Sequence, residues 1–214
     1  MSAVGLGITQ HGLRIGDTAC GSSMPHLSTS LQATRRAKER FEARDGDATE
    51  LMEPDEAYHV VLLLGPLYHL HHREDRLAAL REARRVLLPG GLLAAAAISR
   101  FASLLDTLVR GTVRDRGVWP VVERDLADGL HDSPRGSDLF TTAYFHRPSE
   151  LRDEVEDAGF SVDVVFGIEG PGWLRAETLA DESAREDVLQ VARAVETEPS
   201  LLGASAHLLA IGRS

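Results

Sequence analysis

Residues 58–98 decide the fold and read YHVVLLLGPLYHLHHREDRLAALREARRVLLPGGLLAAAAI. The stretch opens on a continuous apolar run, Tyr58–Leu64, which stops at Gly65-Pro66, and closes on a second run, Leu92–Ile98. Such runs are typical of strands covered on both faces, as in parallel sheets. Between them, apolar residues recur every three or four positions, with acids early and arginines late, until Pro89-Gly90-Gly91 ends the helical pattern. Strand, helix and strand in this order predict a βαβ unit with parallel strands.

The alternation continues toward the C-terminus after an interruption at residues 100–147. That segment predicts two helices, Phe101–Arg110 and Val121–Leu130, joined by turns rich in Gly, Ser and Pro. After it, the sequence predicts a helix, a strand, a long helix and a final apolar segment, at 149–159, 160–168, about 176–196 and 205–212. The predicted fold class is α/β: a Rossmann-like, open, mostly parallel sheet flanked by helices, with a helical insertion, or lid, after one central strand.

The N-terminal part of the chain is harder to interpret. Residues 1–30 are rich in Gly, Ser and Thr and show no sustained period, so the N-terminal strands are doubtful. From Leu31 the segment LQATRRAKERFEA is rich in strong helix formers. We therefore divide the chain into a poorly interpretable segment, 1–30, and an α/β domain, 31–214, which contains the insertion at 100–147.

Composition and charge limit the classes of function. The 214 residues carry a formal net charge of −10 and no Lys/Arg run that could follow a phosphate backbone, so nucleic acid is not an expected partner. No stretch reaches the length of a membrane span, and no leader pattern precedes the domain. Cys20 is the only cysteine, which fits a reducing compartment. The expectation is a cytoplasmic protein, a monomer or homodimer, with no membrane partner.

The order of elements resembles that of class I S-adenosylmethionine-dependent methyltransferases of the small-molecule type. Three stretches carry the resemblance: DGDATEL (45–51), DEAYHVVLLLGPLYHL (55–70) and ALREARRVLLPGGLLAAAAIS (79–99). The segments FTTAYFHRPSELRDEVEDAGF and GIEGPGWL are similar to the C-terminal half of such enzymes, so the resemblance covers about residues 45–214. It implies S-adenosylmethionine as the cofactor and methyl transfer to a small-molecule acceptor.

The resemblance also implies four cofactor-binding residues. Asp47 and the small Ala48 fall where the family binds adenine, through a carboxylate and a backbone N–H. Leu64 and Gly65 fall where backbone carbonyls meet the amino end of the cofactor, and Gly65 would allow a close approach. The alternatives are an ordinary turn at Asp47 and a simple strand-ending turn at Gly65.

The family's glycine-rich loop is missing or scrambled in this sequence. One expects an apolar strand ending in an acid, then a G-x-G-x-G loop that opens a helix. Here Gly5-Leu6-Gly7 follows only MSAV, Asp17 follows no apolar run, and Ser22 or Ser23 stands where a ribose-binding acid would be. We expect residues 1–24 to be a frameshifted segment, a truncation or a genuine divergence.

Two consequences follow from that missing loop. Without a first strand, the apolar edge of Tyr58–Leu64 would be unpaired, unless residues 2–9 substitute as a short strand. Cofactor affinity should also be weaker than in a relative that has the loop.

Methyl transfer needs no protein nucleophile, so the expected protein group is a general base facing the pocket. His69, just beyond the predicted strand Tyr58–Leu64, is the candidate catalytic residue. The alternative is a surface or capping histidine. His71 and His72 should face water at the start of the next helix, and the three histidines lack the second-sphere carboxylates of a zinc site, so no metal is expected.

Four residues are candidates for substrate binding. Tyr68 adjoins His69, whereas Tyr144 and His146 end the insertion and could lie over the acceptor. Trp173 could form an aromatic wall, although it could equally anchor its Gly-Pro loop, and Tyr144 could equally pack in the core.

Two other functions compete with methyl transfer. The missing loop favours a degenerate, non-catalytic member of the fold, and Gly5-x-Gly7 weakly suggests an NAD-dependent oxidoreductase. Ser-His-Asp hydrolysis is disfavoured, because no G-x-S-x-G elbow occurs.

Overall fold

The structure is a computed structural model and describes residues 3–9, 12–15, 45–132, 142–174 and 182–214. The predicted helix that starts at Leu31, together with Asp17, Cys20, Ser22 and Ser23, lies outside the described residues.

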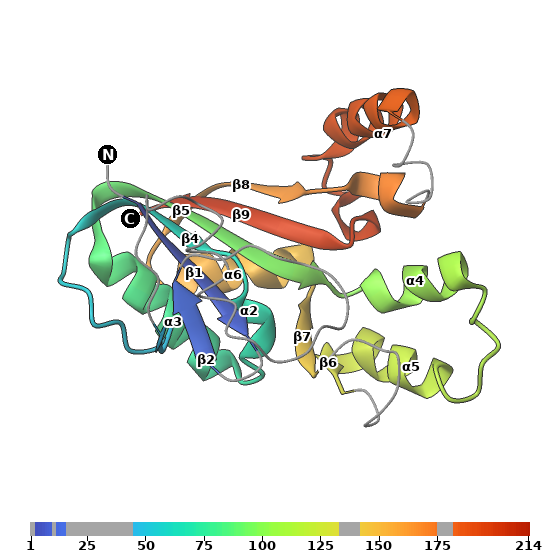
Figure 1. The fold of residues 1–214 in the computed structure, drawn as a ribbon, viewed down its shortest axis with the longest axis horizontal. Coiled ribbons are helices and arrows are strands. Elements are labelled where there is room, and N and C mark those ends of the chain that lie inside the picture. Colours follow the sequence, from blue (N-terminus) through green and yellow to red (C-terminus); the bar gives the residue numbers. More distant parts are fainter. Residues whose placement is uncertain (1–2, 10–11, 16–44, 133–141, 175–181) are drawn as a thin grey trace.

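A single sheet runs through the molecule and confirms the predicted α/β class (Figure 1). Its strands follow the order β3-β2-β1-β4-β5, continued by β9 and then β8. Strands β1, β4 and β5 are mutually parallel, and β9 is antiparallel to both of its neighbours. The described strands before the insertion are β1 Ala3–Thr9, β2 Gly12–Ile15, β3 Asp45–Gly46, β4 Tyr58–Leu63 and β5 Leu87–Ser99.

The N-terminal segment supplies a first strand after all. β1 pairs in parallel with β4, from Ala3 opposite Val60 to Leu6 opposite Leu63, so the apolar edge of β4 is covered. The interpretation of the first residues as a poor strand is wrong, and the alternative of a short substitute strand is confirmed. The chain then reverses, and β2 pairs antiparallel to β1, with Thr9 opposite Gly12.

The predicted βαβ unit is present as β4, α3 and β5. Helix α3 spans Arg73–Val86. Strand β5 begins directly at Leu87, where we expected Pro89-Gly90-Gly91 to form a turn. The glycines lie inside the strand at a register shift: Gly90 has φ +74°, and a Cβ on Gly91 would meet the Leu88 carbonyl oxygen at 2.8 Å.

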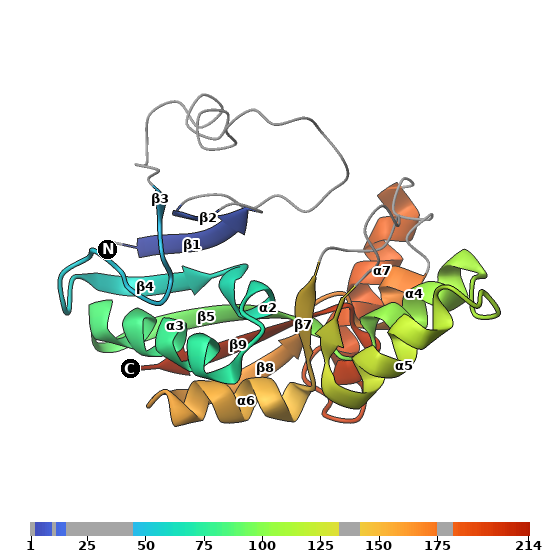
Figure 2. The same ribbon diagram turned by 90° about the horizontal axis from the view of Figure 1, so that it is seen from below.

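The main core lies between the sheet and the helices on one of its faces, α2 Pro66–His69, α3 and α6 Pro148–Asp157 (Figure 2). Alternate residues of β4 point into it, so Val61 and Leu63 are fully buried while Val60 and Leu62 are half-buried on the other face. The described helices α2, α3 and α6 therefore cover one face, whereas the sequence pattern predicted cover on both.

The insertion after β5 contains two helices, as predicted, and also a hairpin. Helices α4 Ala102–Arg110 and α5 Trp119–Asp128 lead into β6 Leu130–His131 and β7 Ala143–His146. The end of β5 pairs in parallel with β7, with Ile98 opposite Phe145. The hairpin thus extends the sheet beyond the carboxyl end of β5.

The C-terminal elements match the predicted order. They are α6, β8 Ser161–Gly167, α7 Glu182–Val195, the short helix η2 Leu202–Ala204 and β9 His207–Arg213. Within the described ranges, none of the helices combines the length and apolar character needed to cross a bilayer.

Candidate functional site

The candidate site lies at the sheet edge formed by the carboxyl ends of β3 and β4. Because β2 is antiparallel to both β1 and β3, β3 runs parallel to β4. The register then places Asp47, just after β3, and Leu64, just after β4, at the same edge. Three strand spacings separate the two strands, or about 14 Å. Ligands of open α/β sheets bind at this edge.

Asp47 forms a tight local turn. Its Oδ1 accepts hydrogen bonds from the backbone N–H of Thr49 at 2.9 Å and from the Thr49 hydroxyl at 2.8 Å. The side chain is exposed, and among the described residues no hydrogen bond uses Oδ2. Ala48 is buried at 3% exposure and fixes the loop to the core. The turn and the predicted adenine role are therefore compatible.

Gly65 and Leu64 end β4 and lead straight into the short helix α2. Gly65 is buried as the residue before this helix, Pro66 occupies its first turn, and Leu67 is fully buried. These contacts hold the strand end rigidly against the core. The backbone there is suited to carry fixed carbonyl groups at the sheet edge.

The glycine pair at the N-terminus does not form a ligand-binding loop. Gly5 pairs with Leu62 of β4, and Gly7 pairs with Arg14 of β2, so both lie inside the ladder. The residues present therefore fit one half of the cofactor site, at Asp47 and the end of β4. Among the described residues, Gly5 and Gly7 are paired inside strands and do not form a loop that opens a helix.

Tyr68 and His69 lie together on α2, with ring centroids 4.7 Å apart. Tyr68 is half-buried against Ile98, Ala143 and Phe145. Burial and the neighbouring His71 lower the pKa of His69, which favours a neutral imidazole able to accept a proton. His72 is the exposed residue that precedes α3, as expected, and His71 is half-buried.

A buried arginine fixes α2 relative to the rest of the domain. Arg76 is only 2% exposed, and its guanidinium donates to Glu154 of α6 through Nε and Nη2. Its Nη1 donates to the carbonyls of Leu70 and His71, at 2.9 Å each, and so holds the turn between α2 and α3. The same guanidinium lies 3.6 Å from the ring centre of Tyr144, a cation–π contact.

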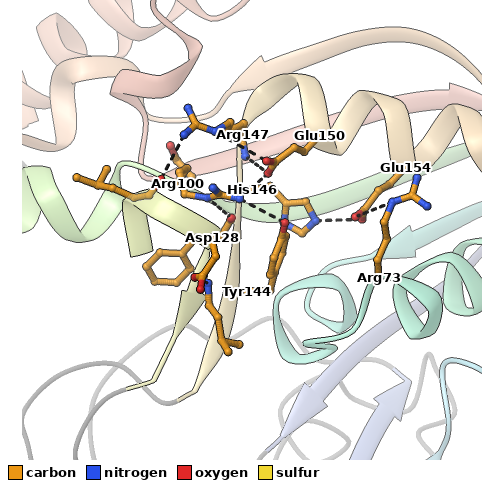
Figure 3. A network of polar contacts seen from close by, with 12 residues as sticks. Arg73, Arg100, Asp128, Tyr144, His146, Arg147, Glu150 and Glu154 are labelled. Carbon is orange, nitrogen blue, oxygen red and sulfur yellow. Dashed lines mark hydrogen bonds and ion pairs between the residues drawn. The ribbon is translucent and has the colours of Figure 1, made fainter. Parts of the chain in front are cut away.

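Tyr144 and His146 lie on one side of β7 inside this network (Figure 3). His146 is fully buried, and its Nε2 lies 3.2 Å from Glu154 Oε2. Burial lowers the pKa of His146 and keeps it neutral, so Nε2–H donates to the carboxylate. Tyr144 is half-buried, and burial and Glu150 raise its pKa. In the described structure both side chains contact the ion-pair network formed by Arg76 and Glu154: Tyr144 contacts Arg76, and His146 contacts Glu154. The sequence had instead predicted that both contact the substrate.

A second buried arginine closes the network on the other side of Tyr144. Arg100 donates to the Phe145 carbonyl at 2.8 Å, to Glu150 at 2.7 Å and to the Tyr144 hydroxyl at 3.3 Å. Sequence reasoning missed Arg76, Arg100 and Glu154. One signal was available, because Arg76 occupies the apolar spacing that continues to Leu80 and Ala83.

Trp173 anchors its loop. Its indole Nε1–H donates to the Ala204 carbonyl at 2.8 Å, which ties the loop after β8 to η2. Nearby, Glu169 binds the Ser205 hydroxyl at 2.7 Å, the backbone N–H of His207 at 3.0 Å and the His207 ring Nδ1. This β8–β9 clasp, Glu169 with Ser205 and His207, also lies at the carboxyl edge of β5, because His207 is opposite Ile98.

Within the described ranges, no group of three or more His, Cys, Asp or Glu side chains is arranged to hold a metal ion. His69, His71 and His72 accordingly do not converge on a common point.

Comparison with known proteins shows which proteins the chain resembles. A family model described as a methyltransferase domain matches residues 6–95, so the similarity begins farther toward the N-terminus than residue 45. No curated protein matches the chain significantly.

Solved structures agree on the fold. An S-adenosylmethionine-dependent methyltransferase from Mesorhizobium loti is 13% identical, with 88% of this chain and 77% of that one covered and a TM-score of 0.53. A candidate enzyme of the same type from Listeria monocytogenes is 15% identical, with 86% and 76% covered and a TM-score of 0.50. A third, from Methanosarcina mazei, is 15% identical, with 79% and 65% covered and a TM-score of 0.46. The chain thus spans about two thirds to three quarters of their lengths.

The family model over residues 6–95 describes a methyltransferase domain, and the fold is similar to that of the class of S-adenosylmethionine-dependent methyltransferases. Members of this class are enzymes that transfer a methyl group, and S-adenosylmethionine is their cofactor.

Proposed function

We propose that this chain transfers the methyl group of S-adenosylmethionine to a small-molecule acceptor bound beneath the α4–α5 insertion. The observation that carries the proposal is the shared sheet edge. The register brings the exposed carboxylate of Asp47 and the fixed turn at Leu64-Gly65 to one edge, about 14 Å apart. An extended cofactor could bridge that distance.

Each residue at the edge has a role in this proposal. Asp47 Oδ2 would accept a hydrogen bond from the adenine amine, and the backbone at Leu64 and Gly65 would hold the amino end. When bound, the cofactor supplies a methyl group on a positively charged sulfur, ready for in-line displacement. The protein positions the acceptor and removes its proton, and His69, kept neutral by burial, is one group able to do so.

The acceptor side would be formed by α2 and the insertion. Tyr68 packs against Phe145 and Ile98, where β5 meets β7. The ion-pair network around Tyr144 and His146 would fix the position of β7 and α2, and so of Phe145 and Tyr68. Trp173 would act indirectly, through the loop it anchors. The acidic charge supports a metabolite acceptor rather than nucleic acid. The proposal also includes a cytoplasmic monomer or homodimer without a membrane partner.

A second candidate is a non-catalytic protein of the same fold. The β1–β2 hairpin favours it, because Gly5 and Gly7 are used in strand pairing.

A thermal-shift comparison separates the candidates. The proposed function predicts a higher melting temperature with S-adenosylmethionine and with S-adenosylhomocysteine, and no change with NAD, because a ligand that binds only the folded state stabilises it. No shift with any of the three would support the non-catalytic alternative. A shift with NAD alone would indicate an oxidoreductase.

A further inference from the structure

A buried aspartate–histidine pair in the insertion has no role in the ion-pair network. His131 of β6 is 3% exposed and Asp125 of α5 is 0% exposed. The His131 Nδ1 lies 2.8 Å from Asp125 Oδ2. The imidazole also stacks on the Phe145 ring, with centroids 4.8 Å apart and planes inclined by 12°.

The turn between α5 and β6 fixes this geometry. Gly129 ends α5 with φ +81°, and its carbonyl accepts a hydrogen bond of 2.7 Å from the Phe145 N–H. A Cβ at Gly129 would lie 2.5 Å from both the Phe145 carbonyl oxygen and Arg100 Nη2. Only glycine therefore lets β6 approach β7 closely enough for His131 to stack on Phe145.

The pair leaves a basic atom without a partner. Because the Asp125 carboxylate can only accept, the hydrogen bond places a proton on Nδ1, and a neutral imidazole then has its lone pair on Nε2. Nε2 is buried and has no hydrogen-bond partner among the described residues. Burying an unpaired acceptor costs about 1–3 kcal/mol, so such an atom calls for an explanation.

The location of the pair suggests that explanation. Phe145 belongs to the cluster against which Tyr68 packs, and Tyr68 lies three residues after Gly65, at the candidate cofactor edge. His131 thus stacks on a member of the aromatic and apolar cluster that also includes Tyr68.

We propose that Asp125 and His131 form the proton-accepting pair for an acceptor that carries an aromatic hydroxyl. The inference rests on the proposed function and names its substrate class. The acceptor's O–H bond breaks, its electron pair stays on oxygen, and the proton forms a new bond to His131 Nε2. The resulting imidazolium is stabilised by the Asp125 carboxylate. A phenol needs this help, since its pKa near 10 leaves it neutral at pH 7.

The test uses 4-nitrophenol, whose phenolate is yellow and whose neutral form is not. The intact protein, without cofactor, is added to the probe near pH 7, and the phenolate absorption is recorded. We expect the protein to raise the phenolate fraction, because His131 takes the proton. The variant His131→Gln places an amide near Nε2 that can accept a hydrogen bond but not a proton, so the bound probe should stay neutral. Asp132→Asn, an exposed neighbour, is the matched control and should behave as the natural protein.

A second variant and a second readout guard against a folding defect. Asp125→Asn keeps the imidazole and should lower the phenolate fraction without abolishing it. With S-adenosylmethionine present, His131→Gln should slow methyl transfer to phenol about 10²–10⁴-fold. The same variant should slow transfer to 4-nitrophenol far less, at a pH where that probe is already ionised.

Three results would overturn the inference. They are no spectral change with the natural protein, an unchanged phenolate fraction in His131→Gln, and equal loss of transfer to the two phenols. Failure of the proposed function is visible separately, as an absence of calorimetric S-adenosylmethionine binding while the phenolate signal persists.

Discussion

At the residue scale, the buried ion pair of Arg76 and Glu154 fixes the position of α2, the helix proposed to lie on the acceptor side. Burial alone would raise the pKa of Glu154, but hydrogen bonds from His146 and Arg76 outweigh it and bring that pKa down to about 2. The carboxylate is therefore ionised at every physiological pH. It fixes the protonation of His146 and the orientation of Arg76.

The network predicts how stability depends on pH. The pKa of Glu154 is about 2 in the folded state and 4.5 as its ordinary value, so its contribution is present above pH 4.5 and is lost as the pH falls toward 2. That contribution is no more than about 3.4 kcal/mol. The pKa of His146 is also lowered, so its contribution is present above pH 6.5 and declines below it.

Urea unfolding at several pH values measures this dependence. Glu154→Gln should cost about 3–5 kcal/mol at pH 7, because it leaves the Arg76 charge buried and unpaired, and its stability should vary less with pH. Glu156→Gln, on the exposed side of the same helix, should change stability by less than about 0.5 kcal/mol. A Glu154→Gln protein as stable as that control would contradict the role of the network.

At the element scale, β1 protects the central apolar strand of the sheet. Ala3, Val4, Gly5 and Leu6 cover the edge of β4 through a parallel ladder. An unpaired apolar edge invites pairing with another chain.

Removal of residues 1–9 should therefore promote association. Size-exclusion chromatography with light scattering should show oligomers or aggregates for the truncated chain under conditions where the full chain has its native size. Replacing Val60 with Lys in the truncated chain should reduce that association, because an edge lysine blocks strand pairing. A truncated chain that elutes like the full one would contradict this role for β1.

The β8–β9 clasp makes a separate prediction. The hydrogen bond with Glu169 raises the pKa of His207, and hydrogen bonds with His207 and Ser205 lower the pKa of Glu169 against the opposing effect of burial. The His207 contribution to stability is therefore present below pH 6.5 and lost as the pH rises through its raised value. The Glu169 contribution is present above pH 4.5 and lost as the pH falls through its lowered value.

An NMR titration of the histidine ring protons tests the clasp, with His207→Gln used to assign the signal. In the natural protein His207 should titrate above 6.5, and in Glu169→Gln its pKa should fall toward 6.5. A value at or below 6.5 in the natural protein would show that the pair does not form in solution.

At the scale of the whole molecule, much of the sheet could be predicted from local patterns. Tyr58–Leu64, the helix at 73–86 and the segment at 205–212 each carry a period or a continuous apolar run long enough to identify the element. Strands β2 and β7 could not be predicted, because four residues with mixed polarity become a strand only through tertiary pairing.

The candidate site divides in the same way. Asp47 and Gly65 are visible in the sequence, because a strand end followed by a turn has a local signature. The pairs Arg76–Glu154 and Asp125–His131 are not, because the first joins residues 78 positions apart and the second depends on the Gly129 turn.

Calorimetric titration with S-adenosylmethionine tests the central claim most directly, in the natural protein and in Asp47→Asn, with Asp163→Asn of β8 as control. We expect saturable binding weaker than low-micromolar, in the range of about 10⁻⁵–10⁻³ M, because Gly5 and Gly7 are used in strand pairing. Asp47→Asn should weaken it about tenfold, or 1.4 kcal/mol, and Asp163→Asn should leave it unchanged. No binding, or binding that Asp47→Asn does not change, would contradict a cofactor site at this edge, and low-micromolar affinity would contradict the inferred effect of the missing loop.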